Sequence, residues 1–194
     1  MRNYIITFIV IVALVITFSI VFFFALKSYF ETNKSNNNTL NLNLKLDVQL
    51  PFKNNSLIPK TYTCDGKDIN PWIKITNYKQ IKEKLEKEGV DNIYLVVIVH
   101  DPDAPKDFVH WLAVIPFSNE IQEGSSQKGL YLEGKNDFGF IGYGGPCPPK
   151  NQIHHYYFEF CLVNEKPKEL TYDYLQKECE NAIAKTTIIG LYGR

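Results

Sequence analysis

The sequence predicts a mostly-β domain, built as a β-sandwich with a few short helices and preceded by one transmembrane helix. Three observations support this prediction. Short apolar or alternating runs outnumber helical patterns, long irregular connections separate these runs, and no strand–helix alternation of the doubly wound kind is present. The transmembrane helix is predicted from the first apolar run of the chain.

This first run extends from Tyr4 to Leu26 and contains no charged side chain. A helix of about 1.5 Å rise per residue and this length spans a hydrocarbon core of roughly 30 Å with some tilt. A cleaved signal peptide is the alternative, but its apolar region is usually about 7–15 residues long and ends at a small-x-small site, which the run lacks. We therefore expect residues 1–27 to form an uncleaved signal anchor that contacts the membrane through residues 4–26.

Residues 28–41 are rich in Asn, Thr, Ser and Lys, and this composition predicts a flexible polar stalk before a folded domain at residues 42–194. The positive charges that flank the anchor do not decide its orientation. Glycosylation acceptor triplets begin at Asn33, Asn37 and Asn54, although an Asn-rich stretch also forms such triplets by chance. Together with four cysteines in a small domain, they favour a single-pass protein whose domain is extracytoplasmic.

The domain contains recognisable strand and helix patterns. Alternation over residues 42–50, ended by Pro51, predicts a half-buried strand, and the continuous apolar run at residues 93–99 predicts a buried one. Further strands are expected at residues 72–75, 109–116, 156–162 and 186–191. A charged helix is expected at residues 78–88, closed by Gly89. A second helix is expected after Thr171, with Leu175, Cys179, Ala182 and Ile183 on its apolar side.

Composition excludes several function classes. Acidic and basic residues balance at 21 each, and the two arginines, Arg2 and Arg194, lie outside any basic patch, so we expect no nucleic-acid partner. No C-x-x-C pair supports a zinc site, and no G-x-S-x-G supports a serine hydrolase. A metal-dependent hydrolase that uses Asp101, Asp103, His110 and His154 is an alternative, but no H-E-x-x-H spacing supports it. We therefore predict a protein that is not an enzyme and uses neither a metal nor a cofactor.

Polar residues gather where the strands begin or end. Asp101-Pro102-Asp103-Ala104-Pro105 follows the most apolar strand of the domain, and rigid polar strand ends are places where binding groups are displayed. His110 and the pair His154-His155 begin two other strands. The loop at residues 142–149 holds three glycines and three prolines, which permit close backbone approach and stiffness together. An ordinary turn with structural histidines is the alternative interpretation.

These motifs together resemble the phosphatidylethanolamine-binding protein family. They are Asp101-Pro102-Asp103-Ala104-Pro105, His110-Trp111, the Gly142 to Pro149 loop and His154-His155-Tyr156. The resemblance is closest to the bacterial and archaeal Raf-kinase-inhibitor-like branch of the YbhB and YbcL type. It runs from about residue 45 to the end of the sequence, with the motifs in the family's order, and leaves out the anchor and the stalk.

The resemblance implies a small surface pocket for a phosphate-bearing headgroup or another small anion. The implied wall consists of Asp101, Asp103, His110, Gly145, Pro146, His154 and Tyr156. A phosphate would contact the histidines, the tyrosine hydroxyl and the glycine N–H, while the ammonium of a zwitterion such as phosphoethanolamine would lie near a carboxylate.

The resemblance also implies a Cys64–Cys147 disulfide near the pocket, and it leaves Cys161 and Cys179 free or paired. Four reduced thiols are the alternative in a cytoplasmic domain. The chain departs from the family pattern at His155, where an arginine is common, and in the short loop after Pro105. The extra C-terminal helix of the family's eukaryotic branch is not expected here.

The expected function is therefore that of a membrane-tethered, non-enzymatic binding protein. The alternative is an inhibitor of serine proteases or kinases that acts through a surface loop, a role that some family members have.

Overall fold

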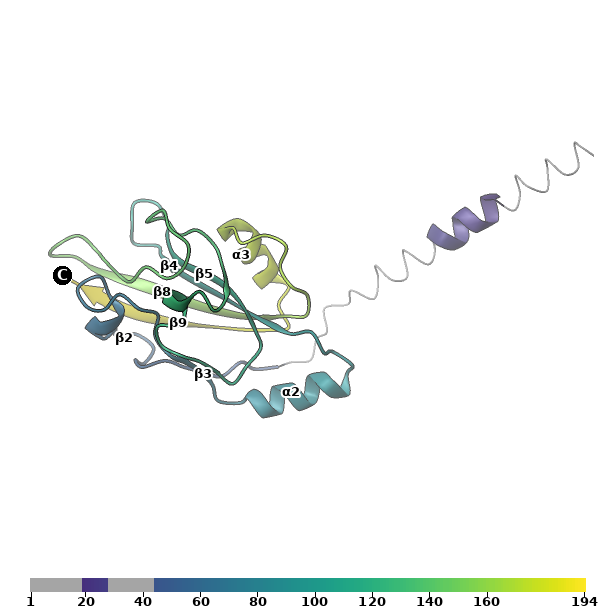
Figure 1. Cartoon of the computed structure of the whole chain (residues 1–194), viewed down its shortest axis with the longest axis horizontal. Coiled ribbons are helices and arrows are strands. Elements are labelled where there is room, and N and C mark those ends of the chain that lie inside the picture. The colour runs from purple at the N-terminus through teal and green to yellow at the C-terminus, as the bar shows by residue number, and fades with distance from the viewer. Residues whose placement is uncertain (1–18, 28–43) are drawn as a thin grey trace, which may run out of the picture. The chain divides into compact units, whose positions relative to one another are not determined.

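Two β-sheets form the folded domain of the computed structural model, which describes residues 19–27 and 44–194 (Figure 1). The larger sheet has the order β2-β9-β8-β4-β5-β7, and all of its neighbours are antiparallel except β2 and β9. Its strands are β2 (Ser56–Leu57), β4 (Tyr94–Asp101), β5 (Phe108–Pro116), β7 (Leu132–Glu133), β8 (Ile153–Val163) and β9 (Ala184–Gly193). The smaller antiparallel sheet has the order β1-β3-β6, with β1 (Val48–Gln49), β3 (Ile73–Ile75) and β6 (Glu120–Ile121).

The central strands are buried on both faces, because each face of the larger sheet packs against a different partner. In β4, Leu95, Val97 and Val99 belong to a core cluster that also contains Ile73 and Ile121 of the smaller sheet. Val96 and Ile98 belong to a second cluster on the opposite face, together with residues of α3. A strand covered on both sides is expected to be apolar at every position, which is the pattern of residues 93–99.

The helices cover the two faces separately (Figure 1). Helix α2 (Tyr78–Lys87) places Ile81 and Leu85 in the core that the two sheets share. Helix α3 (Tyr172–Glu180) packs Leu175 and Cys179 on the other face of the larger sheet, and a Cys161–Cys179 disulfide joins α3 to β8. Two short 3₁₀ helices, η1 (Lys60–Tyr62) and η2 (Ser126–Lys128), lie in the connecting segments.

The predicted mostly-β architecture is confirmed, and several boundaries are corrected. Of the strand expected at residues 42–50, only Val48–Gln49 is paired, while residues 42 and 43 lie outside the described residues. Strands β2, β6 and β7 fall in segments predicted to be irregular. Helix α3 ends at Glu180, before two of the residues assigned to its apolar side, and the Thr171 side chain makes no capping hydrogen bond.

The predicted anchor and stalk fall mostly outside the described residues. Residues 19–27 are helical, and within the described parts of the chain no helix is long and apolar enough to cross a membrane. The chain divides into two units, residues 1–40 and residues 41–194, and both described sheets lie in the second. The membrane anchor therefore stays a prediction.

Candidate functional site

A β-bulge decides the direction in which His110 points. The pairing of β4 with β5 steps from Val99 opposite Trp111 to His100 opposite Val109, which leaves His110 as an extra residue in β5. Side chains normally alternate between the two faces of a sheet, and a bulge interrupts this alternation. Consequently Trp111 is part of the core between the sheets, and the adjacent His110 ring also contacts Tyr156 of that core.

Three of the residues predicted to bind a ligand form a row of rings. Tyr156 lies between the two histidines, with its ring centroid 5.2 Å from that of His110 and 6.5 Å from that of His154. His154 and Tyr156 are two residues apart on β8, so their side chains share one face of the sheet, while His110 comes from β5 on the far side of β4. The structure therefore brings together residues that are up to 46 positions apart in the sequence.

The tautomer of His110 follows from its hydrogen bond. Its Nδ1 lies 2.7 Å from the carbonyl oxygen of Gly144, which can only accept, so Nδ1 carries the proton and donates. Burial lowers the pKa of His110, and the Gly144 carbonyl and the more distant Asp101 charge only partly oppose this effect. At neutral pH the ring is therefore uncharged and its Nε2 is a hydrogen-bond acceptor.

The hydroxyl of Tyr156 is buried without a hydrogen-bond partner among the described residues. The Asp101 carboxylate and the Cys147 backbone influence this hydroxyl, but neither makes a hydrogen bond of acceptable geometry with it. Burial, and secondarily the charge of Asp101, raises the pKa of Tyr156 well above its usual value, so the group remains an O–H donor. A buried donor without a partner is uncommon, because it costs about 1–3 kcal/mol.

The Asp101 carboxylate is hydrogen-bonded both to the turn that follows β4 and to His154. Its Oδ1 accepts the backbone N–H groups of Asp103 and Ala104, an arrangement that fixes the turn after β4. Its Oδ2 lies 2.7 Å from Nδ1 of His154, and both side chains are buried. The second nitrogen of His154, Nε2, is 3.0 Å from the side-chain amide of Gln152.

Asp103 is engaged by His155 and not by the row of rings. Its Oδ2 accepts the backbone N–H of His155 at 2.8 Å and lies 2.7 Å from Nδ1 of the same residue. These hydrogen bonds with His155 lower the pKa of Asp103. His155, the residue at which the sequence departs from the expected pattern, is therefore the hydrogen-bond partner of this carboxylate.

The Gly145-Pro146 segment is fixed against the loop that contains Cys64. The Gly145 N–H donates to Oδ1 of Asp68 at 2.6 Å, and the carbonyl oxygen of Pro146 accepts the N–H of Cys64 at 3.2 Å. A Cβ at Gly145 would lie 2.5 Å from the carbonyl oxygen of Tyr62, so no side chain fits there. The contact of the Gly145 N–H with a phosphate, which the family resemblance implies, stays a prediction, and a ligand at this N–H would have to displace Asp68.

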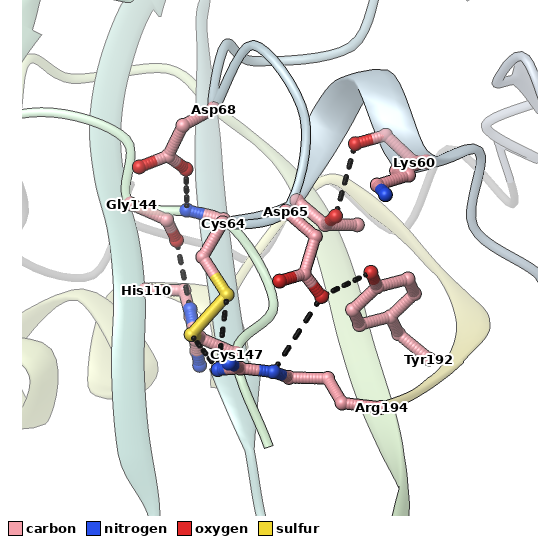
Figure 2. The surroundings of a disulfide bond; sticks show 11 residues. Lys60, Cys64, Asp65, Asp68, His110, Gly144, Cys147, Tyr192 and Arg194 are labelled. Carbon is pink, nitrogen blue, oxygen red and sulfur yellow. Dashed lines mark hydrogen bonds and ion pairs between the residues drawn. A yellow bond between two sulfur atoms is a disulfide. The ribbon is translucent and has the colours of Figure 1, made fainter. Parts of the chain in front are cut away.

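A disulfide between Cys64 and Cys147 joins the same two loops, and this is the pairing implied by the resemblance (Figure 2). The guanidinium of Arg194 lies against it, with Nη1 3.0 Å from the sulfur of Cys147. The Oδ2 atom of Asp65 lies 3.5 Å from Nε of this arginine and also accepts a hydrogen bond from the Tyr192 hydroxyl at 2.6 Å (Figure 2). The disulfide thus lies against the residue that follows β9.

His100 does not join the row of rings. Its Nδ1 lies 2.7 Å from Asp107, its Nε2 lies 3.4 Å from Glu159, and its ring contacts Tyr157 and Tyr172 on the face covered by α3. Burial opposes its protonation, but hydrogen bonds and charge interactions with Glu159 and Asp107 outweigh burial and raise the pKa of His100. Tyr172 of α3 donates to Asp107 at 2.6 Å, so this cluster links α3 to the sheet.

Two residues at the site, Asp68 and Phe138, could not be predicted from the sequence. Asp68 is 77 positions from the N–H that it accepts, and no local pattern indicates this contact. Phe138 lies with its ring centroid 5.3 Å from that of His110, in a segment that was predicted only to be irregular. Within residues 19–27 and 44–194, no group of three or more His, Cys, Asp or Glu side chains could hold a metal ion.

Comparison with known proteins identifies the family. Residues 49–193 match the family model described as phosphatidylethanolamine-binding protein. The chain belongs to this family. The resemblance noted in the sequence is thereby confirmed, and the family's fold accounts for the two sheets and short helices described above.

Similar proteins come from archaea and bacteria, among them Pyrococcus horikoshii and Aquifex aeolicus. A UPF0098 protein of Pyrococcus horikoshii is 41% identical over 167 residues, covering 78% of each chain. A UPF0098 protein of Aquifex aeolicus is 36% identical over 159 residues, covering 74% of this chain and 85% of its own. The chain is therefore a member of this family that is similar to its UPF0098 proteins.

Two solved structures share the fold. The crystal structure of a putative phosphatidylethanolamine-binding protein homologue from Chlamydia trachomatis superposes with a TM-score of 0.62 at 26% identity, covering 77% of this chain and 98% of that one. Escherichia coli YbcL, described as a member of the mammalian family, has a TM-score of 0.62 at 23% identity, covering 78% and 99%. The second likeness concerns the fold alone.

Proposed function

We propose that this chain is a non-enzymatic binding protein, tethered to a membrane through residues 4–26, whose site accepts a small phosphate-bearing anion or headgroup. The supporting observation is the buried Tyr156 hydroxyl, which has no partner among the described residues and lies between His110 and His154. Because such a donor is costly to leave unsatisfied, an acceptor supplied by a ligand accounts for its retention.

The charged groups around the rings define what the ligand can contact. Asp101 and Asp103 are each hydrogen-bonded to a histidine, so an ammonium group would have to displace one of these hydrogen bonds. The anionic part of the ligand can accept from Tyr156 and bond to Nε2 of His110. It reaches His154 when the exposed Gln152 side chain moves away from Nε2, and such a side-chain rotation is inexpensive.

Anion binding should strengthen as the pH falls. Burial lowers the pKa of His110, so the free ring is neutral near pH 7, and a bound anion favours its protonated form. Because the bound state then takes up a proton, affinity rises as the pH decreases through the pKa that the ring has in the complex.

Calorimetric titration of the full chain with inorganic phosphate tests this proposal. Performed in a non-ionic detergent from about pH 5.5 to about pH 8, it should show an affinity that rises toward low pH. His110→Gln should weaken binding and flatten this dependence, whereas the matched change His155→Gln, at a histidine paired with Asp103, should leave phosphate affinity unchanged. Equal affinities for the His110 variant and the unmodified chain, at every pH, would contradict the assignment. A parallel incubation with p-nitrophenyl phosphate should release no nitrophenol.

The proposed outward orientation of the domain rests on its cysteines. All four are paired, as Cys64–Cys147 and Cys161–Cys179, and disulfides persist in oxidising compartments. We expect the domain on intact cells to be digested by an added protease, and the chain to stay with the membrane after an alkaline carbonate wash. A domain that is protected until the cells are permeabilised would overturn the orientation, and a chain released by the wash would overturn the tether.

A further inference from the structure

An open hollow on the outer face of the smaller sheet contains a half-buried tryptophan. The hollow has a volume of about 520 Å³, within the range of about 300–1,000 Å³ that ligand clefts usually have. Residues of β3, β6 and the segments next to them line it: Trp72, Lys74, Glu120, Gln122 and Glu123. We refer to this feature as the Trp72 hollow. Its lining residues are different from those of the candidate site described above.

The strand register explains why these side chains face outward. Lys74 of β3 pairs with Glu120 of β6, and both side chains are exposed. The next pair along the two strands consists of isoleucines that are buried in the core between the sheets. Trp72 and Gln122 each lie one residue beyond that buried pair. Because side chains alternate between the two faces of a sheet, these two residues return to the outer face.

Buried hydrogen bonds hold the two sides of the Trp72 hollow together. The side chain of Asn70 is fully buried, and its amide donates to the carbonyl oxygen of Pro71 at 3.0 Å and to that of Gln122 at 3.1 Å. Pro71, whose ring restricts the backbone, directly precedes Trp72. The tryptophan and the facing segment are therefore fixed before any ligand arrives, and a preorganised site loses less conformational freedom on binding.

The polar groups around the tryptophan are available to a ligand. In the described part of the chain, no hydrogen bond or ion pair engages the side chains of Trp72, Lys74, Glu120 and Gln122. They supply donors from the indole, the ammonium and the amide, and acceptors from the carboxylate and the amide. The charges of Lys74 and Glu120 balance each other. This combination suits an uncharged ligand that has an apolar face and many hydroxyl groups.

We propose that the Trp72 hollow binds a neutral oligosaccharide, with one pyranose ring stacked on Trp72 and its hydroxyl groups bonded to the neighbouring polar side chains. A pyranose has a flat face of C–H groups, which the negative face of an indole ring attracts, and a rim of hydroxyl groups that both donate and accept. A cation would also be attracted to the indole and to Glu120, but Lys74 would repel it. The balanced charges therefore favour the sugar.

A second hollow gives room for further sugar rings. It shares Lys74 with the Trp72 hollow, continues along residues 75–80 with Asn119, and has a volume of about 280 Å³. Its lining is also mostly polar, with Thr76 and Gln80 among the residues. An extended chain of sugars matches two adjoining hollows better than a single ring does. This inference is independent of the proposed function, because the two sites share no residue.

Fluorescence titration of the full chain with three neutral tetrasaccharides tests the inference. The probes are cellotetraose, maltotetraose and the β-linked tetramer of N-acetylglucosamine, each added to about 5 mM so that millimolar dissociation constants are detected. The chain has two tryptophans, and Trp111 is fully buried, so a saturable blue shift in emission reports a sugar that covers Trp72. A polyoxyethylene detergent is used, because detergents with sugar headgroups would compete. We expect at least one tetrasaccharide to bind.

Variants measured by calorimetry locate the bound sugar. Trp72→Ala should weaken binding at least about tenfold through loss of the stacked ring, and Gln122→Ala, at an exposed residue that does not affect folding, should weaken it about threefold or more. Glu120→Gln keeps an acceptor for a hydroxyl group and should change the affinity less than about threefold. Phe140→Ala, at an aromatic residue that is 46% exposed outside the hollow, is the matched control and should change nothing. Phosphate binding should be the same in Trp72→Ala as in the unmodified chain.

Three results would overturn the inference. If none of the three tetrasaccharides binds, the hollow is not a saccharide site, and the proposed phosphate site is unaffected. If a tetrasaccharide binds equally well to Trp72→Ala, Gln122→Ala and the unmodified chain, the sugar lies elsewhere. If tetramethylammonium binds, is lost in Glu120→Gln, and no tetrasaccharide binds, the hollow accepts a cation instead. Binding that is weakened in Trp72→Ala or Gln122→Ala but retained in Phe140→Ala supports the inference.

Discussion

Tyr156→Phe should stabilise the domain and at the same time weaken its binding of phosphate. The substitution removes one oxygen and keeps the ring that packs between His110 and His154. In the described structure that oxygen is buried and has no hydrogen-bond partner, so its removal eliminates a desolvation cost that is only partly compensated.

The expected gain follows from that cost. An unsatisfied buried hydroxyl costs about 1–3 kcal/mol, and the proximity of the Asp101 carboxylate recovers part of it, so we expect a gain of about 1 kcal/mol in the free energy of unfolding. For a domain of this size the change corresponds to a rise in Tm of about 2–4 °C. Loss of a hydrogen bond to a charged ligand should weaken phosphate binding by about 1.5–3 kcal/mol, or roughly 10- to 150-fold.

Tyr143→Phe is the matched control. Tyr143 is equally buried, but its hydroxyl donates to the carbonyl oxygen of Tyr62 at 2.7 Å. Removal of this hydroxyl leaves the Tyr62 carbonyl without its hydrogen bond, so the free energy of unfolding of this variant should fall by about 1–3 kcal/mol, with a lower Tm. Denaturant unfolding of the three proteins, followed by tryptophan fluorescence, measures both changes. Equal destabilisation of the two variants would refute the reasoning, because it would mean that the Tyr156 hydroxyl has a structural partner.

The remaining predictions concern the face covered by α3. The raised pKa of His100 means that its ion pairs with Asp107 and Glu159 contribute stability fully below the unfolded pKa of about 6.5, and that this contribution is lost as the pH rises through the folded pKa. Unfolding midpoints measured from about pH 5.5 to about pH 9 should therefore fall more for the unmodified chain than for His100→Gln, and parallel curves would contradict this. Replacing the Cys161–Cys179 disulfide, which has a sequence separation of 18, by two alanines should lower the free energy of unfolding by about 3 kcal/mol. The same replacement of Cys64–Cys147, which has a separation of 83, should lower it by about 4.5 kcal/mol because a longer loop is released. If the two losses came in the reverse order, the loop-entropy argument would not hold for this chain.

The sequence predicts the long elements well because their patterns are local. The central strands β4, β5 and β8 each carry enough consecutive apolar or alternating residues to be recognised. Strands β2, β6 and β7 are two residues long, and their pairing depends on a neighbouring strand rather than on their own residues. No periodicity extends over two residues, so these strands could not be predicted.

The candidate site was predicted only in part, because some of its features also depend on residues that are remote in the sequence. His110, His154, Tyr156 and Asp101 do lie together, as the resemblance implies. The one-residue bulge that turns His110 toward Tyr156 is a tertiary feature without a local signal. The Gly145 N–H was assigned to a ligand because its acceptor, Asp68, is remote in sequence.

The position of β9 in the larger sheet has a consequence for folding. Residues Gly190 and Leu191 pair with Ser56 and Leu57 of β2, and the whole of β9 pairs with β8. During synthesis, more than 130 further residues must therefore be added after β2 before the part of β9 that pairs with it exists. Until then β8 exposes an unpaired edge, which is a site of misassociation. We therefore expect slow folding that is completed only after β9 has been synthesised, in agreement with the non-local pairings of such a sheet.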